Sequence, residues 1–383
     1  MKFILPKSTL EKAMAQIDAI VPGRDTQTLL SNVLLGIEKD RVRITASDME
    51  STVRISIDAE DTEPGELIVR AKKLSEIARQ INSEKVVFSS EIDEEAEGSD
   101  EGAVHRVRLE GSGKMAAKFR MAGSDRSHFP EMTEISSDKL SKVPADILSE
   151  MIAKTVYSIS QEDNRYIYNG LYFLADGNKL TIVGTDGRRL AAVSRTVPEP
   201  ISIGSAEAGD IVVHAKAIRE LVKIMESGED VSIGVEQRDV FFQVDQAELS
   251  SRLLEGKFPD YKKVIPGTSE IDFEINRADL SDAIRQVMVM TEQPSYQVRL
   301  SLSAGGVELS ANTPDVGEAE IMLPVEGLDQ ELVIGFNANY LMDILKNLDC
   351  EMVRLKFIDP AKPIVVEDTG DDQFVSLVMP MKI

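Results

Sequence analysis

One short amphipathic pattern occurs three times along the chain, and this repetition constrains the fold more than any other feature. The sequence reads VRAKKLSEIARQI at 69–81, VHAKAIRELVKIM at 213–225 and FNANYLMDILKNL at 336–348. The three copies align without gaps on Ala71, Ala215 and Ala338, and apolar residues follow at the third, sixth, seventh and tenth positions after each alanine. That spacing places the apolar side chains on one face of a helix. Each copy therefore predicts an amphipathic helix.

Two further triplets occur in the same order. The first comprises LPKSTLEKAM from Leu5, VPADILSEMI from Val143 and INRADLSDAI from Ile275. These segments predict a second helix in each copy, with N-caps expected at or next to Ser8, Asp146 and Asp279. The other triplet comprises the alternating runs RITASD, LTIVGTD and VELSANT, which end in turn residues and predict strands. Three matches in register indicate three homologous units of roughly 130 residues.

The remaining sequence of each unit consists mostly of short β-branched runs separated by Gly, Asn and Asp turns. Each unit is therefore predicted to be an α+β domain with two helices and antiparallel sheets. HFPEM from His128 and KFPDY from Lys257 mark the ends of the first two units. The predicted domains are 1–136, 137–266 and 267–383.

An acidic stretch interrupts the first unit. SSEIDEEAEGSDEG lies where copies one and two lose their alignment, and it carries seven acidic residues between Glu91 and Glu101. Such a segment predicts a solvated hairpin tip. A metal site in this loop is the alternative interpretation.

Charge and cysteine content limit the environment and the partners. The net charge of −23 opposes general affinity for nucleic acid or anionic membranes, although a local patch can differ from the whole surface. Cys350 is the only cysteine, which excludes an intramolecular disulfide and suits a reducing compartment. The first residues lack the pattern of a signal peptide, and no apolar run reaches the length of a membrane span. We expect a soluble cytoplasmic protein.

Enzymatic motifs are not found. The three histidines, His105, His128 and His214, do not have the spacing of a zinc site, and no nucleophile elbow occurs. GSGKM from Gly111 resembles the end of a phosphate loop, but Arg108 and Met115 stand where that motif needs Gly and Ser or Thr. A hairpin turn is the better interpretation. We predict no catalytic residue, no metal and no cofactor.

Three similar units in a row can pair edge to edge within the chain, which leaves one sheet edge on the first unit and one on the third. A dimer that joins these edges closes six units into a ring. A unit of this size has a radius of gyration of ~14 Å, so six units would surround a hole of roughly 35 Å. A DNA duplex with its hydration shell fits that hole.

The first two copies of the repeated helix are positively charged within this acidic chain. The first contains Arg70, Lys72, Lys73 and Arg79 against Glu76. The second contains three cations against Glu220, whereas the third is neutral. An ordinary solvated helix face is the alternative to a DNA-facing surface.

The chain resembles the bacterial β sliding clamp family, the processivity subunits of DNA polymerase III holoenzyme, over its whole length. The similarity rests on seven stretches in order: MKF at 1, PGR at 22, NRYIYNG at 164, GTDGRRLA at 184, FPDY at 258, IGFNANYLMDIL at 334 and VMPMKI at 378. The resemblance implies a ring-shaped head-to-tail homodimer with helices lining the hole. It also implies a clamp that encircles duplex DNA and tethers the replicative polymerase.

By this resemblance, the DNA-binding residues are Arg24, Lys72, Lys73, Arg79, Tyr166 and Lys216. The family usually has two adjacent tyrosines at Tyr166, and this chain has Ile167 at the second. The implied partners are double-stranded DNA, the polymerase III catalytic subunit, the clamp loader, and other polymerases and repair proteins that bind through short peptides. No membrane partner is implied.

The resemblance also implies a groove for those peptides. One side comprises Arg165, Tyr168, Thr185, Gly187, Arg188, Leu190, Pro259, Lys263 and Val264. The other comprises Asn337, Tyr340, Leu377, Val378, Met379, Pro380 and Met381. The family often has an aromatic residue near Ser295, so either Tyr296 substitutes for it or the pocket is more open.

The implied dimer interface pairs Val289 and Met290 with Phe119 and Met121 of the other subunit. Assignment of these stretches to the internal core is the alternative. Two other functional classes remain open: a triplicated peptide-binding adaptor that never encircles DNA, and an enzyme with an unrecognised site.

Overall fold

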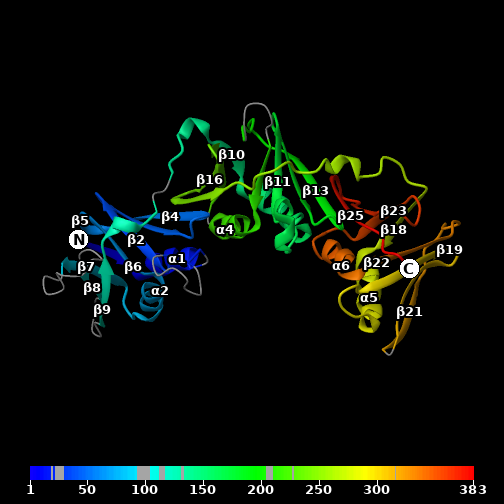
Figure 1. The fold of residues 1–383 in the computed structure, drawn as a ribbon, viewed down its shortest axis with the longest axis horizontal. Coiled ribbons are helices and arrows are strands. Elements are labelled where there is room, and N and C mark those ends of the chain that lie inside the picture. The colour runs from blue at the N-terminus through cyan, green and yellow to red at the C-terminus, as the bar shows by residue number, and fades with distance from the viewer. Residues whose placement is uncertain are drawn as a thin grey trace. The chain divides into compact units, whose positions relative to one another are not determined.

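The structure is a computed structural model that describes residues 1–18, 20–21, 30–92, 104–111, 117–130, 133–203, 210–226, 228–314 and 316–383. The chain forms two compact units (Figure 1). Unit 1 comprises Met1–Ala145 and Lys216–Leu253, and unit 2 comprises Asp146–Ala215 and Leu254–Ile383. The middle third of the chain is therefore shared between them.

Six α-helices occur in the described chain, and they confirm both helix triplets. They are α1 Lys7–Ile17, α2 Ala71–Gln80, α3 Ala145–Ala153, α4 Ala215–Met225, α5 Arg277–Val287 and α6 Ala338–Lys346. The aligned alanines are the first residues of α2, α4 and α6. The apolar faces predicted from the spacing are buried: Leu74 and Ala78 in α2, and Leu341, Ile344 and Leu345 in α6.

The helix starts correct one sequence prediction, because Ser8, Asp146 and Asp279 are not N-caps. Each lies within the first turn of α1, α3 or α5. The cap of α5 is Asn276, whose side chain accepts hydrogen bonds from the amides of Ala278 and Asp279. Asp146 and Asp279 favour the helix start through the helix dipole instead.

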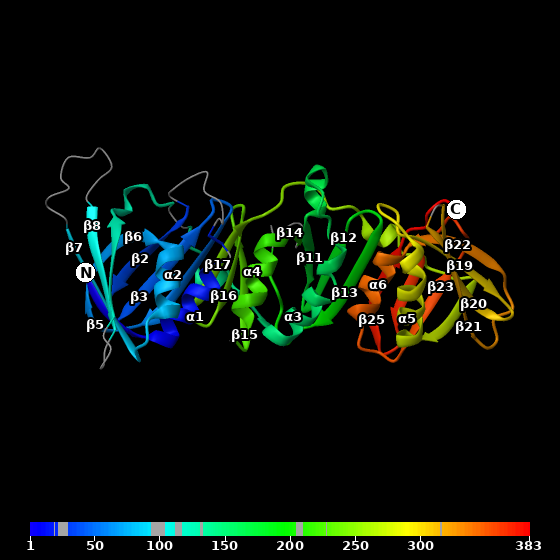
Figure 2. The same cartoon turned by 90° about the horizontal axis from the view of Figure 1, so that it is seen from below.

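Unit 1 is built on one sheet of thirteen strands in the order β10-β15-β16-β17-β4-β3-β2-β6-β9-β8-β7-β1-β5. Their bounds are β1 Lys2–Pro6, β2 Asn32–Glu38, β3 Arg41–Ser47, β4 Ser51–Asp58, β5 Glu60–Glu63, β6 Gly65–Arg70, β7 Lys85–Ile92, β8 Val104–Gly111, β9 Lys118–Ser124, β10 Ser141–Pro144, β15 Asp230–Glu236, β16 Asp239–Val244 and β17 Ala247–Arg252. The helices α1 and α2 lie side by side against this sheet (Figure 2). Their apolar faces, including Leu10, Met14 and Leu74, form the core with the inward residues of the strands.

Unit 2 contains two sheets. The larger has the order β14-β11-β12-β13-β25-β24-β23-β18, and the smaller has the order β21-β20-β19-β22. Their bounds are β11 Gly170–Asp176, β12 Lys179–Thr185, β13 Arg189–Thr196, β14 Asp210–His214, β18 Ile271–Asn276, β19 Gln297–Ser303, β20 Gly306–Thr313, β21 Gly317–Leu323, β22 Leu332–Asn337, β23 Met352–Phe357, β24 Ile364–Asp368 and β25 Asp371–Val378. The predicted strand triplet corresponds to β3, β12 and β20.

Sheets continue between sequence repeats at two seams, as the edge-pairing argument expects. In unit 1, β17 pairs antiparallel with β4, with Ser251 opposite Ser51. In unit 2, β13 pairs antiparallel with β25, with Leu190 opposite Leu377. We call these the β4–β17 seam and the β13–β25 seam.

Among the described strands with unpaired backbone are β9 in the first repeat and β21 in the third. In β9, residues 118–122 pair with β8 alone, because β6 reaches only Gly123 and Ser124. The strand β21 pairs only with β20. The edge-pairing argument expects one free edge on each of these repeats; β5, β10, β14, β18 and β22 also lie at sheet ends.

The two loops singled out in the first repeat lie largely outside the described residues. The strands β7 and β8 pair from Val86–Gly111 to Ile92–His105, so the acidic stretch joins the strands of a hairpin. Its residues 93–103 are outside the described residues, as are residues 112–115 of GSGKM and the following residue 116. The flanking residues Gly111 and Ala117 share a backbone hydrogen bond of 3.0 Å.

Candidate functional site

The helix α2 presents a row of exposed cations on the surface of unit 1. Lys72, Lys73 and Arg79 are all exposed. Lys73 Nζ lies 2.7 Å from Glu76, and its hydrogen bond lowers the pKa of that carboxyl. Arg79 lies 2.5 Å from Asp18, the C-cap of α1. Lys72 has no carboxylate within 4.0 Å in the described part of the chain.

Lys216 and Arg24 are the other two cations predicted to bind DNA. Lys216, at the start of α4, forms an ion pair with the buried carboxylate of Asp48. Arg24 lies outside the described residues.

Tyr166 lies in the 3₁₀ helix Asp163–Tyr168, and 55% of its surface is exposed. The adjacent Ile167 instead packs against a buried apolar cluster. The replacement of the family's second tyrosine by isoleucine therefore places an apolar side chain toward the core.

That cluster, in unit 2, forms the base of the predicted peptide groove. Leu190, Phe258 and Leu377 belong to it, each less than 10% exposed. Tyr168 packs edge-on against Phe258, with 6.3 Å between ring centroids. Val378 is fully buried beneath the surface. Leu190, Leu377 and Val378, which were predicted to line the groove, are therefore buried in the described structure.

The predicted first side of the groove includes a tight turn over residues 185–189. Gly187 has a φ of +81°, a conformation that glycine adopts without strain. The hydroxyl of Thr185 accepts a hydrogen bond from the Gly187 amide and donates one to the Arg189 carbonyl. Asp186 accepts hydrogen bonds from the amides of Arg188 and Arg189 at 2.8 and 2.9 Å. The turn is therefore rigid and holds Arg188 outward in solvent.

The side chain of Arg189 joins this turn to α6. Its guanidinium lies 3.2 Å from Asp186 and 2.6 Å from Asp343, and it stacks over the ring of Tyr340 at 4.7 Å. Tyr340 in turn hydrogen-bonds Arg188, which raises the pKa of that guanidinium. The sequence analysis did not include Arg189 or Asp343 in the site. No local sequence signal identifies Arg189, because its partners Asp343 and Tyr340 lie in α6, far away in the sequence.

Two further segments surround the base. Pro259, Lys263 and Val264 are exposed at and beside the 3₁₀ helix Tyr261–Lys263, and Val264 is 46% exposed. On the other side, Met379 is 36% exposed and Pro380 and Met381 are half-buried. Exposed apolar side chains next to a buried apolar base form a surface that suits apolar peptide anchors.

The remaining groove residues have structural roles as well. Asn337 is buried and caps α6 by accepting a hydrogen bond from the Asn339 amide. Thr185 is likewise buried in its turn. The side chain of Arg165 lies outside the described residues.

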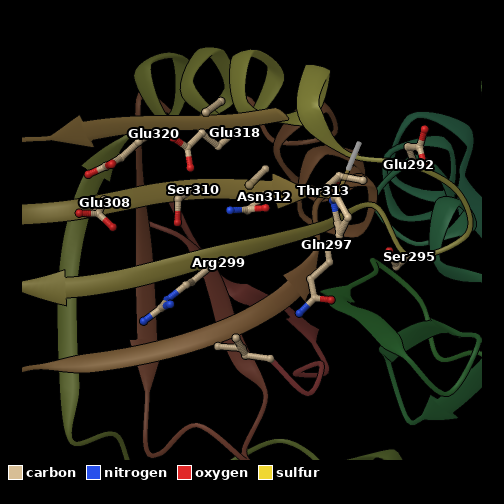
Figure 3. Close-up of a pocket in the computed structure, with 14 residues that line it drawn as sticks. Glu292, Ser295, Gln297, Arg299, Glu308, Ser310, Asn312, Thr313, Glu318 and Glu320 are labelled. Carbon is tan, nitrogen blue, oxygen red and sulfur yellow. The ribbon is translucent and has the colours of Figure 1, made fainter. Parts of the chain in front are cut away.

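Ser295 lines an open hollow of about 830 Å³ on the polar face of the smaller sheet (Figure 3). Tyr296 does not line this hollow, and its φ of +41° places it in a tight turn. Its carbonyl accepts the hydrogen bond of the Ala338 amide at the start of α6. None of the residues predicted to line the peptide groove lines this hollow, so both alternatives for this position stay predictions.

One of the predicted dimer residues is exposed and the other three are half-buried. Phe119 and Met121 share one face of β9 and are half-buried. Val289, in the 3₁₀ helix Met288–Met290, is 71% exposed, and Met290 is half-buried. An exposed valine does not fit the alternative assignment to an internal core.

In the described residues, no group of three or more His, Cys, Asp or Glu side chains has a metal-binding arrangement. Among the helices of the same residues, none combines the length and hydropathy needed to cross a membrane.

Three family models match the chain in consecutive order. They are the N-terminal domain of the DNA polymerase III beta subunit at residues 1–133, the central domain at 142–260 and the C-terminal domain at 262–382. Together they span nearly the whole sequence.

Individual relatives give the same result. Beta sliding clamps of Salmonella typhimurium and Escherichia coli K12 are 29% and 28% identical to the chain, each over the full length of both proteins. The solved structure of Caulobacter crescentus pol III beta is 30% identical with a TM-score of 0.87. That of the Pseudomonas aeruginosa sliding clamp bound to griselimycin is 27% identical with a TM-score of 0.89. Both solved structures are covered completely, as is this chain.

The repeated α+β fold, with its continuous sheets, defines a three-domain sliding clamp. The chain belongs to the DNA polymerase III beta subunit family. The function of this family is that of a processivity clamp on DNA, without catalysis of its own.

Proposed function

We propose that two copies of this chain form a head-to-tail ring around duplex DNA and tether the replicative polymerase to it. The match to all three family domains, in order and over nearly the whole sequence, carries this proposal. The unpaired backbone of β9 and β21 supports the ring, because edge strands pair with other edges unless they are covered. Phe119, Met121, Val289 and Met290 form its apolar contacts. The proposed domains remain 1–136, 137–266 and 267–383.

The proposed contact with DNA is weak. Its residues are Arg24, Lys72, Lys73, Arg79, Tyr166 and Lys216. Lys73, Arg79 and Lys216 each have a carboxylate partner, which reduces the charge that they present to phosphates. Each phosphate contact adds affinity and salt dependence, so few strong contacts favour sliding. Topology then provides the retention that affinity does not.

The groove in unit 2 is proposed to bind short peptides of polymerases, the clamp loader and repair proteins. Burial of two apolar anchors such as Leu and Phe contributes roughly 3 to 6 kcal/mol before the peptide is ordered. The isolated peptide affinity is therefore on the order of micromolar. The proposed tethering of these proteins to DNA takes place in the cytoplasm and needs neither a cofactor nor a catalytic residue.

Retention of the clamp on circular and on linear DNA tests the proposed ring. The clamp is loaded onto a nicked circular plasmid by its clamp loader, and half of the sample is then cut to linear form. We expect retention on the circle and rapid loss from the open ends, with a dimer in analytical ultracentrifugation. Val289→Asp with Met290→Asp is expected to yield folded monomers that are not retained, since the interface would bury unpaired charges. Equal loss from circles and linear DNA would contradict the ring and favour a peptide-binding adaptor.

A further inference from the structure

The segment 379–383, which we call the tail segment, leaves the larger sheet after β25 and is fixed at three points along its backbone. The Met379 amide donates to the Arg188 carbonyl at 2.8 Å. The Met381 amide donates to the Gly335 carbonyl of β22 at 2.7 Å. The Gln297 side-chain amide of β19 donates to the Lys382 carbonyl at 3.1 Å. The last two bonds join the tail segment to the smaller sheet.

Gly335 is where the tail segment approaches the smaller sheet most closely. A Cβ atom at this position would lie 2.9 Å from Ile383 Cγ1, 3.1 Å from the Met381 carbonyl oxygen and 3.2 Å from Gln297 Nε2. The first distance is shorter than real Cβ contacts allow. The backbone of Gly335 is not in the left-handed region, so the space and not the dihedral angle requires glycine here.

Gln297 reaches the tail segment because of its register. Its strand β19 pairs with β22, with Arg299 opposite Gly335 and Gln297 opposite Asn337. Successive side chains alternate across a strand, so Gln297 and Arg299 share the polar face. Figure 3 shows both on that face, together with Ser310 of β20. From there the amide of Gln297 extends to Lys382 rather than into the core.

The spacing of the three bonds determines which tail side chains are left for the groove. Met379 and Met381 have their amides committed to Arg188 and Gly335, which fixes the backbone on both sides of Pro380. In an extended segment, residues two apart point to the same side. The two flexible thioether side chains are thereby presented together on a rigid backbone, next to the turn that holds Arg188.

We propose that Gly335 and Gln297 are positioning residues that hold the tail segment as one wall of the peptide groove. This inference rests on the proposed function of the groove. Neither residue contacts the peptide. They act through Met379 and Met381 by preventing the tail segment from moving away when a peptide is absent. Peptide affinity then includes no cost of ordering this wall.

The test measures the binding of a fluorescein-labelled hexapeptide ending in Leu-Phe by anisotropy, with the full-length dimer. Gly335→Ala and Gln297→Ala are each expected to weaken binding about threefold to tenfold, the worth of roughly one hydrogen bond or one displaced contact. Gly305→Ala is the matched control, since a Cβ there meets nothing closer than 3.7 Å within the same sheet. It should bind as the wild type does.

A second substitution separates positioning from general damage to the fold. Ile383→Ala removes the atom that Gly335→Ala would meet, so the double variant should recover most of the lost affinity. Faster hydrogen exchange of the Met381 amide should accompany both single losses, at an unchanged unfolding midpoint and dimer state. Unchanged peptide affinity in Gly335→Ala and Gln297→Ala, with a wild type that binds, would overturn the positioning role alone. A wild type that binds no peptide would overturn the groove itself, and the positioning role with it.

Discussion

The β4–β17 seam and the β13–β25 seam share one backbone turn and differ in the side chains that this turn carries. Each seam begins with the same turn, Ser47–Ser51 before β4 and Thr185–Arg189 before β13. In both turns, the hydroxyl of the first residue accepts a hydrogen bond from the backbone amide two residues later. The aspartate at the second position accepts hydrogen bonds from the next two backbone amides. The third residue has a φ of +78° at Met49 and +81° at Gly187. The repeats have therefore kept a turn that is defined by hydrogen bonds.

The third position of the turn distinguishes the seams. Glycine at 187 leaves the backbone open to a close approach, whereas Met49 extends a side chain that is 63% exposed. Methionine also costs about 1 kcal/mol in a left-handed conformation relative to glycine. The same backbone thus supports a groove wall in one seam and a protruding side chain in the other.

Charged groups also distinguish the two seams. The β13–β25 seam carries a partly buried network in which Lys154 lies 2.7 Å from Asp371, and Arg195 lies 2.5 Å from both Asp371 and Glu150. The β4–β17 seam has the hydroxyl pair of Ser51 and Ser251 at 3.0 Å, together with Arg54 at 3.4 Å from Glu248. The seam beside the proposed groove is the more heavily braced of the two.

The largest expected effect follows from this network. Lys154→Met leaves the buried Asp368 without its cation and leaves Asp371 paired with Arg195 alone, and should lower the free energy of unfolding by about 2 to 3 kcal/mol. Arg54→Met, the matched change at the other seam, should lower it by less than about 1 kcal/mol, because its glutamate partners are more exposed. Urea unfolding followed by circular dichroism measures both. Equal losses would show that the two seams are braced alike.

The tail segment provides the next test. Met379→Ala with Met381→Ala removes apolar surface but keeps the backbone bonds, so peptide affinity should fall at least about tenfold, or 1.4 kcal/mol. Met49→Ala removes the same kind of side chain from the other seam and should leave the affinity unchanged. Anisotropy with the Leu-Phe peptide measures both variants. If Met49→Ala weakened binding as much, the groove would not be confined to the β13–β25 seam.

Exchange of the third turn residue makes one seam resemble the other. Gly187→Met should lower stability by about 1 kcal/mol through its left-handed φ. It should also weaken peptide binding several-fold, since a protruding side chain then stands at the groove wall. Differential scanning calorimetry and anisotropy give the two quantities. Full binding in this variant would mean that peptides do not approach the turn.

The reverse exchange has the smallest expected effect. Met49→Gly relieves the left-handed strain but adds chain entropy to the unfolded state, so the change in stability should stay within about 0.5 kcal/mol. The thermal midpoint should therefore barely move, and the dimer should persist. A large loss of stability would show that the Met49 side chain has packing partners that its exposure does not reveal.

Local sequence patterns predicted the repeated elements well and the helix starts poorly. The helices that begin at Ala71, Ala215 and Ala338 follow from apolar periodicity, which depends only on neighbours along the chain. The N-caps at Ser8, Asp146 and Asp279 were wrong, because several polar residues near a helix start can serve and backbone geometry selects among them. At α5 the selected residue is Asn276.

The residues around the proposed groove show which contacts the sequence predicts and which it does not. GTDGRRLA identified the turn through its Thr, Asp and Gly, whose hydrogen bonds are local. Arg189 was not singled out, because its partners Asp343 and Tyr340 lie far away in the sequence and meet it only when β13 pairs with β25. The same holds for Gly335 and Gln297, which matter only because the tail segment crosses to the smaller sheet.

The sequence by itself determined the threefold repeat, the amphipathic helices and the turn chemistry, because each of these is encoded within a few neighbouring residues. Only the tertiary structure decided how the repeats join through β4–β17 and β13–β25, and which cations lie beside carboxylates. Lys216 illustrates the difference: its positive charge is plain in the sequence, but its pairing with Asp48 depends on a contact across 168 residues. Such contacts are set by sheet register and packing, which no short stretch of sequence contains.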